Sequence, residues 1–268
     1  MIDQRGKLVV GLSPSSKFLE GLRQAWGILP GESKHRRTEC MIDPRLVKMA
    51  EVLVDYSLEL GTGDKFVISS TDLATPLIKE IYRLALLRGA HPEVQVQLEG
   101  LSKIYFSNAS DEQLQYASPL KEKITLEYDA FLALAADHNP KALTNVDPSR
   151  MALRQRAMAP LNQRFYERAA QGEMRWCVAL FPTQSSAQEA LMSLDEYAEF
   201  VMEACLLNTP NPVEAWREVH ERQQRYVEFL NGIDLVEIKA KDTDLRLRLK
   251  RRTWENCDGK VNFPDGEV

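Results

Sequence analysis

The chain has 268 residues, with 34 Lys and Arg against 39 Asp and Glu, so its formal net charge is −5. A hydrophobic share of 44% is ordinary for a globular protein and excludes wholesale disorder and collagen-like repeats. The slightly acidic balance argues against a nucleic-acid binder, and no apolar run approaches the roughly 18 residues that a membrane helix needs. We therefore expect neither nucleic acid nor a membrane as a partner.

Cysteine usage indicates a reducing compartment. The chain contains no Cys-x-x-Cys pair, which disfavours both a thiolate metal site and a disulfide framework. No signal peptide is visible at the start, so we expect a cytoplasmic protein. The four cysteines are Cys40, Cys177, Cys205 and Cys257.

Residues 1–40 differ from the rest of the chain. They mix Gly, Pro, Ser and basic residues and show no sustained hydrophobic period. We interpret 1–40 either as an upstream extension or as a flexible arm, because the pattern does not separate these alternatives. In both cases we expect limited proteolysis to trim the chain to near Met41.

Helix and strand signals alternate in the next hundred residues. Asp43, followed by proline, predicts the N-cap of a helix that runs to Gly61. Thr75, again followed by proline, begins a second helix that ends at Gly89. Helical pieces then fill about 100–126, with a capping box at Ser110. The β-branched and alternating runs predict strands at 65–70 and 93–98.

The alternation continues to Gly232. Asp147 caps a long helix, Ser193 begins a capping box, and Asn211 starts a polar helix. Apolar runs predict two more strands, at 128–136 and 175–181. Strands separated by helices indicate right-handed crossovers, so we predict an α/β fold for 41–232. This would be a Rossmann-like, three-layer domain with a parallel sheet and helices on both faces.

The pattern changes after Gly232. Residues 234–241 and 244–252 alternate with period two, which predicts an antiparallel hairpin with leucines on one side and basic residues on the other. We therefore place a domain boundary near Gly232 and interpret 233–268 as the start of a second domain. The basic side, which includes Arg246 and Arg248, has no interleaved aromatic residues, so a solvated strand face is favoured over an anion or nucleic-acid patch.

Polar residues follow three predicted strands, at the sheet edge where ligands bind in open α/β proteins. They are 69–72, 137–139 and 182–183. The favoured alternative is that they cap helices and close loops. No glycine-rich phosphate loop follows a strand, which counts against a nucleotide-dependent enzyme. His138 is a candidate site residue, or more simply a loop or capping histidine, whereas Cys177 is expected to be a buried, inert thiol.

The C-terminal run 262–268, Asn-Phe-Pro-Asp-Gly-Glu-Val, presents two carboxylates on either side of a glycine. Such a loop can supply a hard-metal ligand, although Pro-Asp-Gly is also an ordinary turn sequence. This run closely resembles the junction segment of the aminopeptidase T / aminopeptidase S family, whose members are metalloaminopeptidases with two catalytic metal ions. The resemblance extends from Met41 to Val268. It also includes Thr243-Asp244-Leu245, Asp258-Gly259, Arg175-Trp176, Phe181-Pro182-Thr183 and the Met-Ser-Leu-Asp-Glu-Tyr run at 192–197.

The resemblance implies an α/β domain that precedes a metal-carrying catalytic domain, a peptide substrate and a homodimer. Glu267 matches the family's first metal-binding glutamate, and the other ligands lie further along the family's chain. The resemblance also implies two divalent ions (Zn, Co, Mn or Mg), none of them bound by this chain alone and no catalytic residue within it. We expect Asp265 to shape the turn rather than bind metal.

These expectations combine into one hypothesis. The chain would be the N-terminal part of an aminopeptidase that removes N-terminal residues from peptides, and it would be inactive by itself. The alternative is a non-catalytic α/β module that serves dimerisation or substrate gating.

Overall fold

The computed structural model describes residues 43–268, and the extension predicted at 1–40 lies outside them. One compact unit spans Ile42–Val268. The expected boundary near Gly232, with a second domain from 233, therefore stays a prediction.

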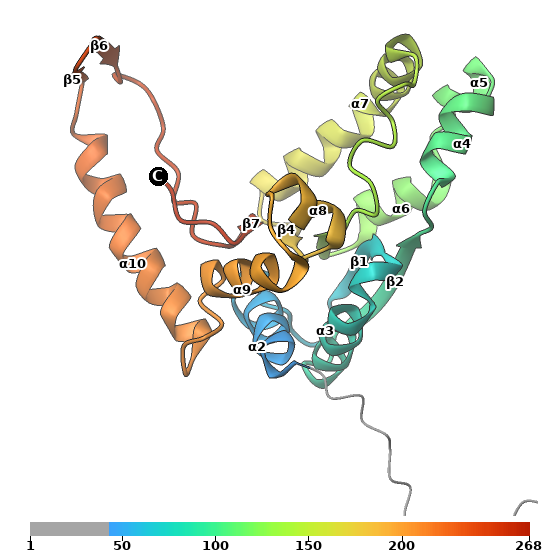
Figure 1. Cartoon of the computed structure of the whole chain (residues 1–268), viewed down its shortest axis with the longest axis horizontal. Helices are drawn as coiled ribbons and strands as arrows, with labels where there is room; N and C mark the ends of the chain where they lie inside the picture. Colours follow the sequence, from blue (N-terminus) through green and yellow to red (C-terminus); the bar gives the residue numbers. More distant parts are fainter. Residues whose placement is uncertain (1–42) are drawn as a thin grey trace, which may run out of the picture. The chain divides into compact units, whose positions relative to one another are not determined.

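A five-stranded parallel sheet forms the centre of this unit, in the order β2-β1-β3-β4-β7 (Figure 1). Its strands are β1 (Lys65–Thr71), β2 (His91–Gln97), β3 (Ala130–Ala135), β4 (Arg175–Leu180) and β7 (Asn262–Phe263). The predicted α/β fold is confirmed. Because β1 pairs with both β2 and β3, the direction of winding reverses there, and the carboxyl ends of these strands meet at a topological switch point.

The helices begin where the capping signals predicted. Side chains of Asp43, Asp147 and Asn211 accept backbone N–H groups of the helices that follow them, and the capping boxes at Ser110 and Ser193 are formed. The helices are α2 (Pro44–Val52), α3 (Thr75–Leu87), α4 (Leu101–Asn108), α5 (Asp111–Gln115), α6 (Pro119–Glu127), α7 (Pro148–Ala170), α8 (Gln184–Glu189), α9 (Leu194–Ala204) and α10 (Pro212–Asn231). Among the described helices, none is long and apolar enough to cross a membrane.

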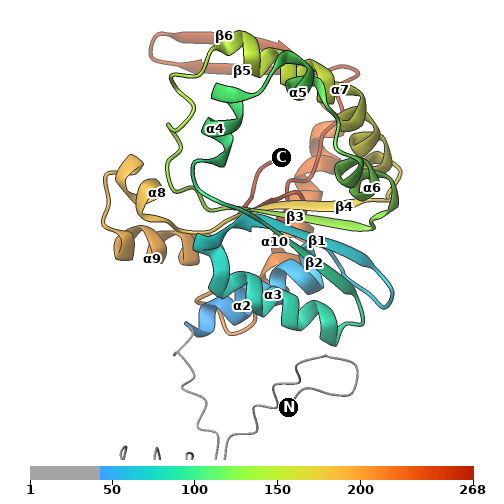
Figure 2. The same ribbon diagram turned by 90° about the vertical axis from the view of Figure 1, so that its right-hand side faces the viewer.

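The two faces of the sheet are covered unequally. Helices α2 and α3 lie on one face and α6 and α7 on the other (Figure 2). Phe66, Ile68 and Leu132 are fully buried on the α2–α3 face. On the opposite face, the ring of Phe165 in α7 packs edge-to-face on Phe131, with 5.9 Å between centroids, yet Met158 is the one residue of α7 that is buried. The main core therefore lies between the sheet and α2–α3.

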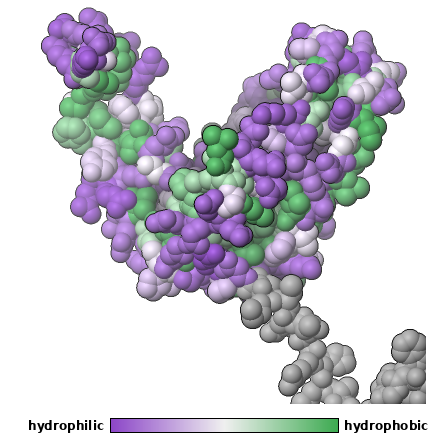
Figure 3. All heavy atoms as spheres, in the orientation of Figure 1, coloured by the Kyte–Doolittle hydropathy of each residue, from purple (hydrophilic) through white to green (hydrophobic). Residues whose placement is uncertain are grey.

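Strands β5 (Leu235–Ala240) and β6 (Thr243–Arg248) form the predicted antiparallel hairpin as a separate two-stranded sheet. Its apolar side is uncovered within the described residues, since Ile238, Leu245 and Leu247 are each more than 40% exposed. The space-filling view shows hydrophobic atoms at the surface in this part of the molecule (Figure 3). An isolated two-stranded hairpin is marginally stable in water, so this element gains little from its own contacts.

Two features depart from the expected elements. The first helix does not continue regularly to Gly61, because α2 passes into a π-helical turn, η1 (Leu53–Ser57), in which the Leu58 N–H donates to the Leu53 carbonyl at 3.0 Å. The chain after the hairpin returns to the sheet, where Asn262 and Phe263 add the unpredicted strand β7 beside β4. Both departures place side chains around the loop formed by residues 256–267.

Candidate functional site

Two of the three predicted groups of strand-end residues come together at the switch point. The ends of β1, β2 and β3 line a cavity of about 440 Å³. His138 stands beside it, with Nε2 2.7 Å from Asp72 Oδ1 and Nδ1 3.6 Å from Glu99 Oε2. The hydrogen bond with Asp72 raises the pKa of His138, and the same bond lowers the pKa of Asp72.

In the strand-end cluster, defined as Asp72, Glu99 and His138, both carboxylates lie beside the imidazole ring. Each ring nitrogen of the histidine faces a carboxylate. The third predicted group does not join them. Instead, the Thr183 side chain accepts the Ser186 N–H at the start of α8. Loop closure and helix capping, the favoured alternative from the sequence, explain these contacts.

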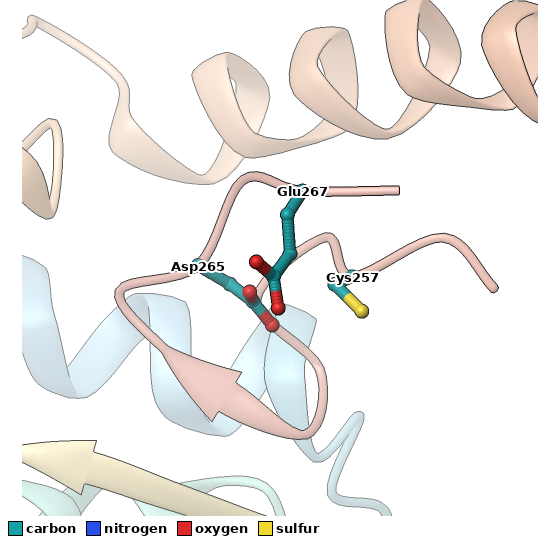
Figure 4. A group of neighbouring side chains, drawn as sticks. All are labelled: Cys257, Asp265 and Glu267. Carbon is teal, nitrogen blue, oxygen red and sulfur yellow. The ribbon is translucent and has the colours of Figure 1, made fainter. Parts of the chain in front are cut away.

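The C-terminal loop, residues 256–267, gathers a different kind of cluster. Cys257 and Glu267 form an antiparallel β-bridge, in which the Cys257 N–H donates to the Glu267 carbonyl at 3.0 Å and the Glu267 N–H donates back at 3.3 Å. Residues paired in this way present their side chains on the same side. Asp265 lies close by, and one ligand atom from each of the three residues lies within 4.8 Å of the others. Figure 4 shows the two carboxylates pointing toward one another, with the Cys257 side chain beside them.

Helix α10 holds this bridge through a buried glutamine. Gln223 is only 5% exposed. Its side-chain Nε2 donates to the carbonyl oxygens of Cys257 at 3.1 Å and Glu267 at 2.8 Å, and to Asn256 Oδ1 at 3.0 Å. Because this one buried amide of α10 donates to both residues of the bridge, it holds Cys257 and Glu267 at a fixed separation.

The π-helical turn holds the other side of the loop. The Tyr56 hydroxyl donates to the Asp258 carbonyl at 3.0 Å, and the Ser57 hydroxyl donates to the Gly259 carbonyl at 2.7 Å. Gly259 has φ +93°, and a Cβ there would lie 3.0 Å from the ring of Trp216, so a side chain would be both strained and crowded. The loop is thus seated on the α/β unit at several points.

The turn that contains Asp265 has the expected local geometry, but one carboxylate oxygen of Asp265 lacks a hydrogen-bond partner among the described residues. Gly266 has φ +139° and donates its N–H to Asp265 Oδ1 at 3.1 Å, as a turn-shaping aspartate requires. Asp265 Oδ2, however, is buried and has no hydrogen-bond partner among the described residues. Burial raises the pKa of Asp265, and the nearby charge of Glu267 adds to this shift.

The cluster has the chemistry of a cation site. Burial raises the pKa of Cys257 as well, with further contributions from the negative charges of Asp265 and Glu267. Two carboxylates and a thiol therefore crowd together without a positive group among them, and a divalent cation would relieve both the repulsion and the unpartnered oxygen. The residues present fit such an ion.

Several residues of this region were not identified from the sequence. Gln223 was missed, although it lies in the buried stripe of α10 among Trp216, Val219 and Val227. A polar residue within an apolar stripe was the available signal. The hydrogen bond between His220 Nδ1 and the buried Asp258 Oδ2, at 2.6 Å, had no local signal in the sequence. Cys177 is buried as expected, and burial raises its pKa to about 12, so it is an inert thiol.

The fold and the site define the class of a candidate metalloprotein: a parallel α/β unit holds a loop whose acidic cluster could bind a metal ion. Within this class the identification is specific. The chain belongs to the thermophilic metalloprotease (M29) family, whose sequence profile matches residues 42–268. The predicted family resemblance, which began at Met41, is confirmed.

Similar proteins agree with this assignment. Aminopeptidase 2 of Geobacillus stearothermophilus is 26% identical over 201 residues, which cover 71% of this chain and 48% of the relative. Aminopeptidase PepS of Streptococcus thermophilus is 26% identical over 238 residues, covering 81% and 56%. Wild-type AmpT from Thermus thermophilus shares the fold, with a TM-score of 0.66 and 22% identity over 83% of this chain and 60% of that one. The chain thus spans about half the length of the curated relatives it matches.

Proposed function

We propose that this chain is the N-terminal portion of a cytoplasmic, metal-dependent aminopeptidase that removes N-terminal residues from peptides. The observation that carries the proposal is the position of Glu267. Its backbone pairs with that of Cys257 across a β-bridge, and its carboxylate lies close to Asp265, which has a buried carboxylate oxygen without a partner among the described residues. Family membership and the names of the two relatives support the peptidase assignment.

Glu267 would hold one of two divalent ions. When bound, such ions supply an activated water and polarise the scissile carbonyl. The α/β unit contributes position, because Gln223 and the π-helical turn fix the loop that presents Glu267. In this proposal the remaining ligands come from a catalytic domain that begins after Gly232, and two copies of the protein form a homodimer around the peptide substrate.

The test of the metal-binding role uses a chain extended to the length of the relatives. Glu267→Gln keeps the size of the side chain but removes its charge, so metal content and nearly all turnover should be lost while the fold remains. Glu255→Gln is the matched control, because Glu255 is an exposed carboxylate of the same segment, and it should keep both. Full metal occupancy and unchanged turnover in Glu267→Gln would show that the assignment is wrong.

A second test concerns the 268-residue chain itself. We expect it not to hydrolyse aminoacyl substrates with any added divalent metal, because Glu267 is the one ligand of the two-ion centre that this proposal assigns to it. Release of an N-terminal residue, measured on chain purified free of host peptidases and abolished by a chelator, would contradict this expectation.

A further inference from the structure

We infer that the cavity between the sheet and helices α6 and α7 binds a planar aromatic acid, that is, a flat ring system that carries one negatively charged group. The cavity has a volume of about 370 Å³ and lies on the sheet face opposite α2 and α3 (Figure 2). Small-molecule sites have volumes of about 300–1,000 Å³. None of the residues that line the cavity belongs to the C-terminal loop, so the inference does not depend on the proposed function.

The register of the strands explains why the sheet has a hollow here. Ser69 of β1 and Ala133 of β3 are in register at the centre of one row across the sheet. Larger residues flank them in the same row, Gln95 on β2 and Val178 on β4. Two small side chains between larger ones leave space that a packed interior would fill.

Helix α7 covers this hollow without filling it. Met158 is the one residue of α7 that is buried, and Pro160 lies inside the helix two residues later. A proline within a helix removes a backbone hydrogen bond, and its ring clashes with the carbonyl four residues before it. Leu161 and Phe165, which follow the proline, line the cavity rather than close it. The cavity therefore results from features of both layers.

Aromatic side chains make up much of the lining. The ring of Phe165 lies 5.9 Å from that of Phe131 and 6.0 Å from that of Trp176, between centroids. The ring of Tyr166 also lies 6.0 Å from that of Trp176, and Tyr166 is 58% exposed, so ring surface is left for a ligand. Aromatic rings favour edge-to-face and offset-stacked partners. The lining therefore favours a ligand with a flat ring.

Three amide side chains line the same cavity, those of Gln95, Gln97 and Asn162. No hydrogen bond joins these amides to another described residue, whereas the amide of Gln163, outside the cavity, donates to Glu167 Oε1 at 2.8 Å. A primary amide offers both a donor and an acceptor. The three amides are thus free to bind polar atoms at the edge of a ring.

The charge of the lining selects the charge of the ligand. Lys121 is the one basic residue that lines the cavity, and no Asp or Glu does. Lys121 has no ion-pair partner among the described residues, whereas Lys123 of the same helix lies 3.8 Å from Glu127. A carboxylate or phosphate would pair with Lys121, but an ammonium group would enter without a partner. The lining therefore disfavours amines and free amino acids.

The experiment is isothermal titration calorimetry of the 268-residue chain with matched ligands. Indole-3-acetate supplies a ring and an acid, tryptamine supplies the same ring with an amine, and acetate supplies the acid alone. We expect indole-3-acetate to bind at least about tenfold more tightly than tryptamine or acetate, because only this ligand satisfies both the rings and Lys121. Adenosine 5′-monophosphate is a second planar aromatic acid. The tighter of the two acids shows whether the ligand class is nucleotides or aromatic carboxylates.

Variants test whether binding occurs in this cavity. Ser69→Phe fills the hollow and should weaken the binding of indole-3-acetate by roughly tenfold or more. Lys121→Met should weaken it by roughly twofold to fivefold, as expected for an exposed ion pair. Lys123→Met, on the same helix, is the matched control and should leave the affinity unchanged. Circular dichroism checks that each variant is folded, and Lys121→Met tests the site on the surface, without any change to the sheet.

Four results would each overturn the inference. They are equal affinity for tryptamine and indole-3-acetate, unchanged binding in folded Ser69→Phe, equal affinities in Lys121→Met and Lys123→Met, and no binding of either aromatic acid at millimolar concentration. The proposed function is tested separately, by the metal content and turnover of Glu267→Gln in the extended chain.

Discussion

The strand-end cluster and the C-terminal loop both bring ionisable side chains together, but they differ in whether the carboxylates have partners. In the strand-end cluster, His138 lies between Asp72 and Glu99, so each carboxylate lies beside a ring nitrogen. In the loop, the cluster of Cys257, Asp265 and Glu267 includes no basic side chain, and one buried oxygen has no partner among the described residues.

This contrast indicates which cluster needs a ligand. A cluster in which each carboxylate lies beside an imidazole nitrogen can stabilise a loop without a further ligand. A cluster of like donors that is held together by other parts of the fold stores repulsion, which a bound cation removes. The position of the strand-end cluster at the switch point is typical of a ligand site. The acidic groups of the loop nevertheless make the loop the better candidate for a cation site. The following predictions test whether the loop is held by the α/β unit and whether the strand-end cluster is only structural.

The largest effect is expected at Trp216, which supports the loop from beneath. This side chain is 1% exposed, packs on Phe263 at 5.2 Å between centroids, and donates its indole N–H to the Cys205 carbonyl. Trp216→Ala should lower the free energy of unfolding by about 3–5 kcal/mol and weaken metal binding with it. Urea unfolding and Co²⁺ titration measure the two effects. Tyr226→Ala, on the exposed side of α10, is the control and should change neither strongly.

A smaller effect is expected at Gln223. Gln223→Leu keeps most of the volume but leaves two carbonyl oxygens and the Asn256 side chain without their donor, so it should cost about 1–3 kcal/mol. Hydrogen exchange at the amides of Cys257 and Glu267 should accelerate, because the bridge opens more often. Arg222→Leu, at an exposed neighbouring position, should leave this exchange unchanged. Equal protection in Gln223→Leu would show that the loop is held without α10.

The smallest effect is expected at the strand-end cluster. The raised pKa of His138 means that the pair contributes stability below the ordinary pKa of histidine, and that this contribution is lost as pH rises through the raised value. Asp72→Asn should lower the pKa of His138 toward its ordinary range and flatten this pH dependence. An NMR titration of the His138 ring measures the shift.

A second measurement on Asp72→Asn is its affinity for Co²⁺. Asp72→Asn should leave Co²⁺ affinity unchanged, because the strand-end cluster is not the cation site. Asp137→Asn, in the same cavity, is the control for a general loss of negative charge. If Asp72→Asn weakened Co²⁺ binding as much as Glu267→Gln does, the comparison between the two clusters would fail.

Local signals in the sequence determined most of the elements. Asp43 and Asp147 cap their helices as expected, because an N-cap acts on amides only two or three residues away. The apolar runs around β3 and β4 predicted buried parallel strands, since both faces of such strands are covered. The C-terminal run also identified Glu267 as a candidate ligand, through family resemblance rather than through spacing.

The C-terminal loop, in contrast, is held by contacts between segments that lie far apart in the sequence. Tyr56 reaches Asp258 across 202 residues, and Gln223 reaches Glu267 across 44. Strand β7 is two residues long and exists because β4 offers it a partner. Cys257 joins Glu267 through a single bridge, which leaves no periodic pattern in the sequence. Capping and hydrophobic periodicity act between near neighbours, whereas a site made from distant segments depends on contacts that form only when the chain is folded.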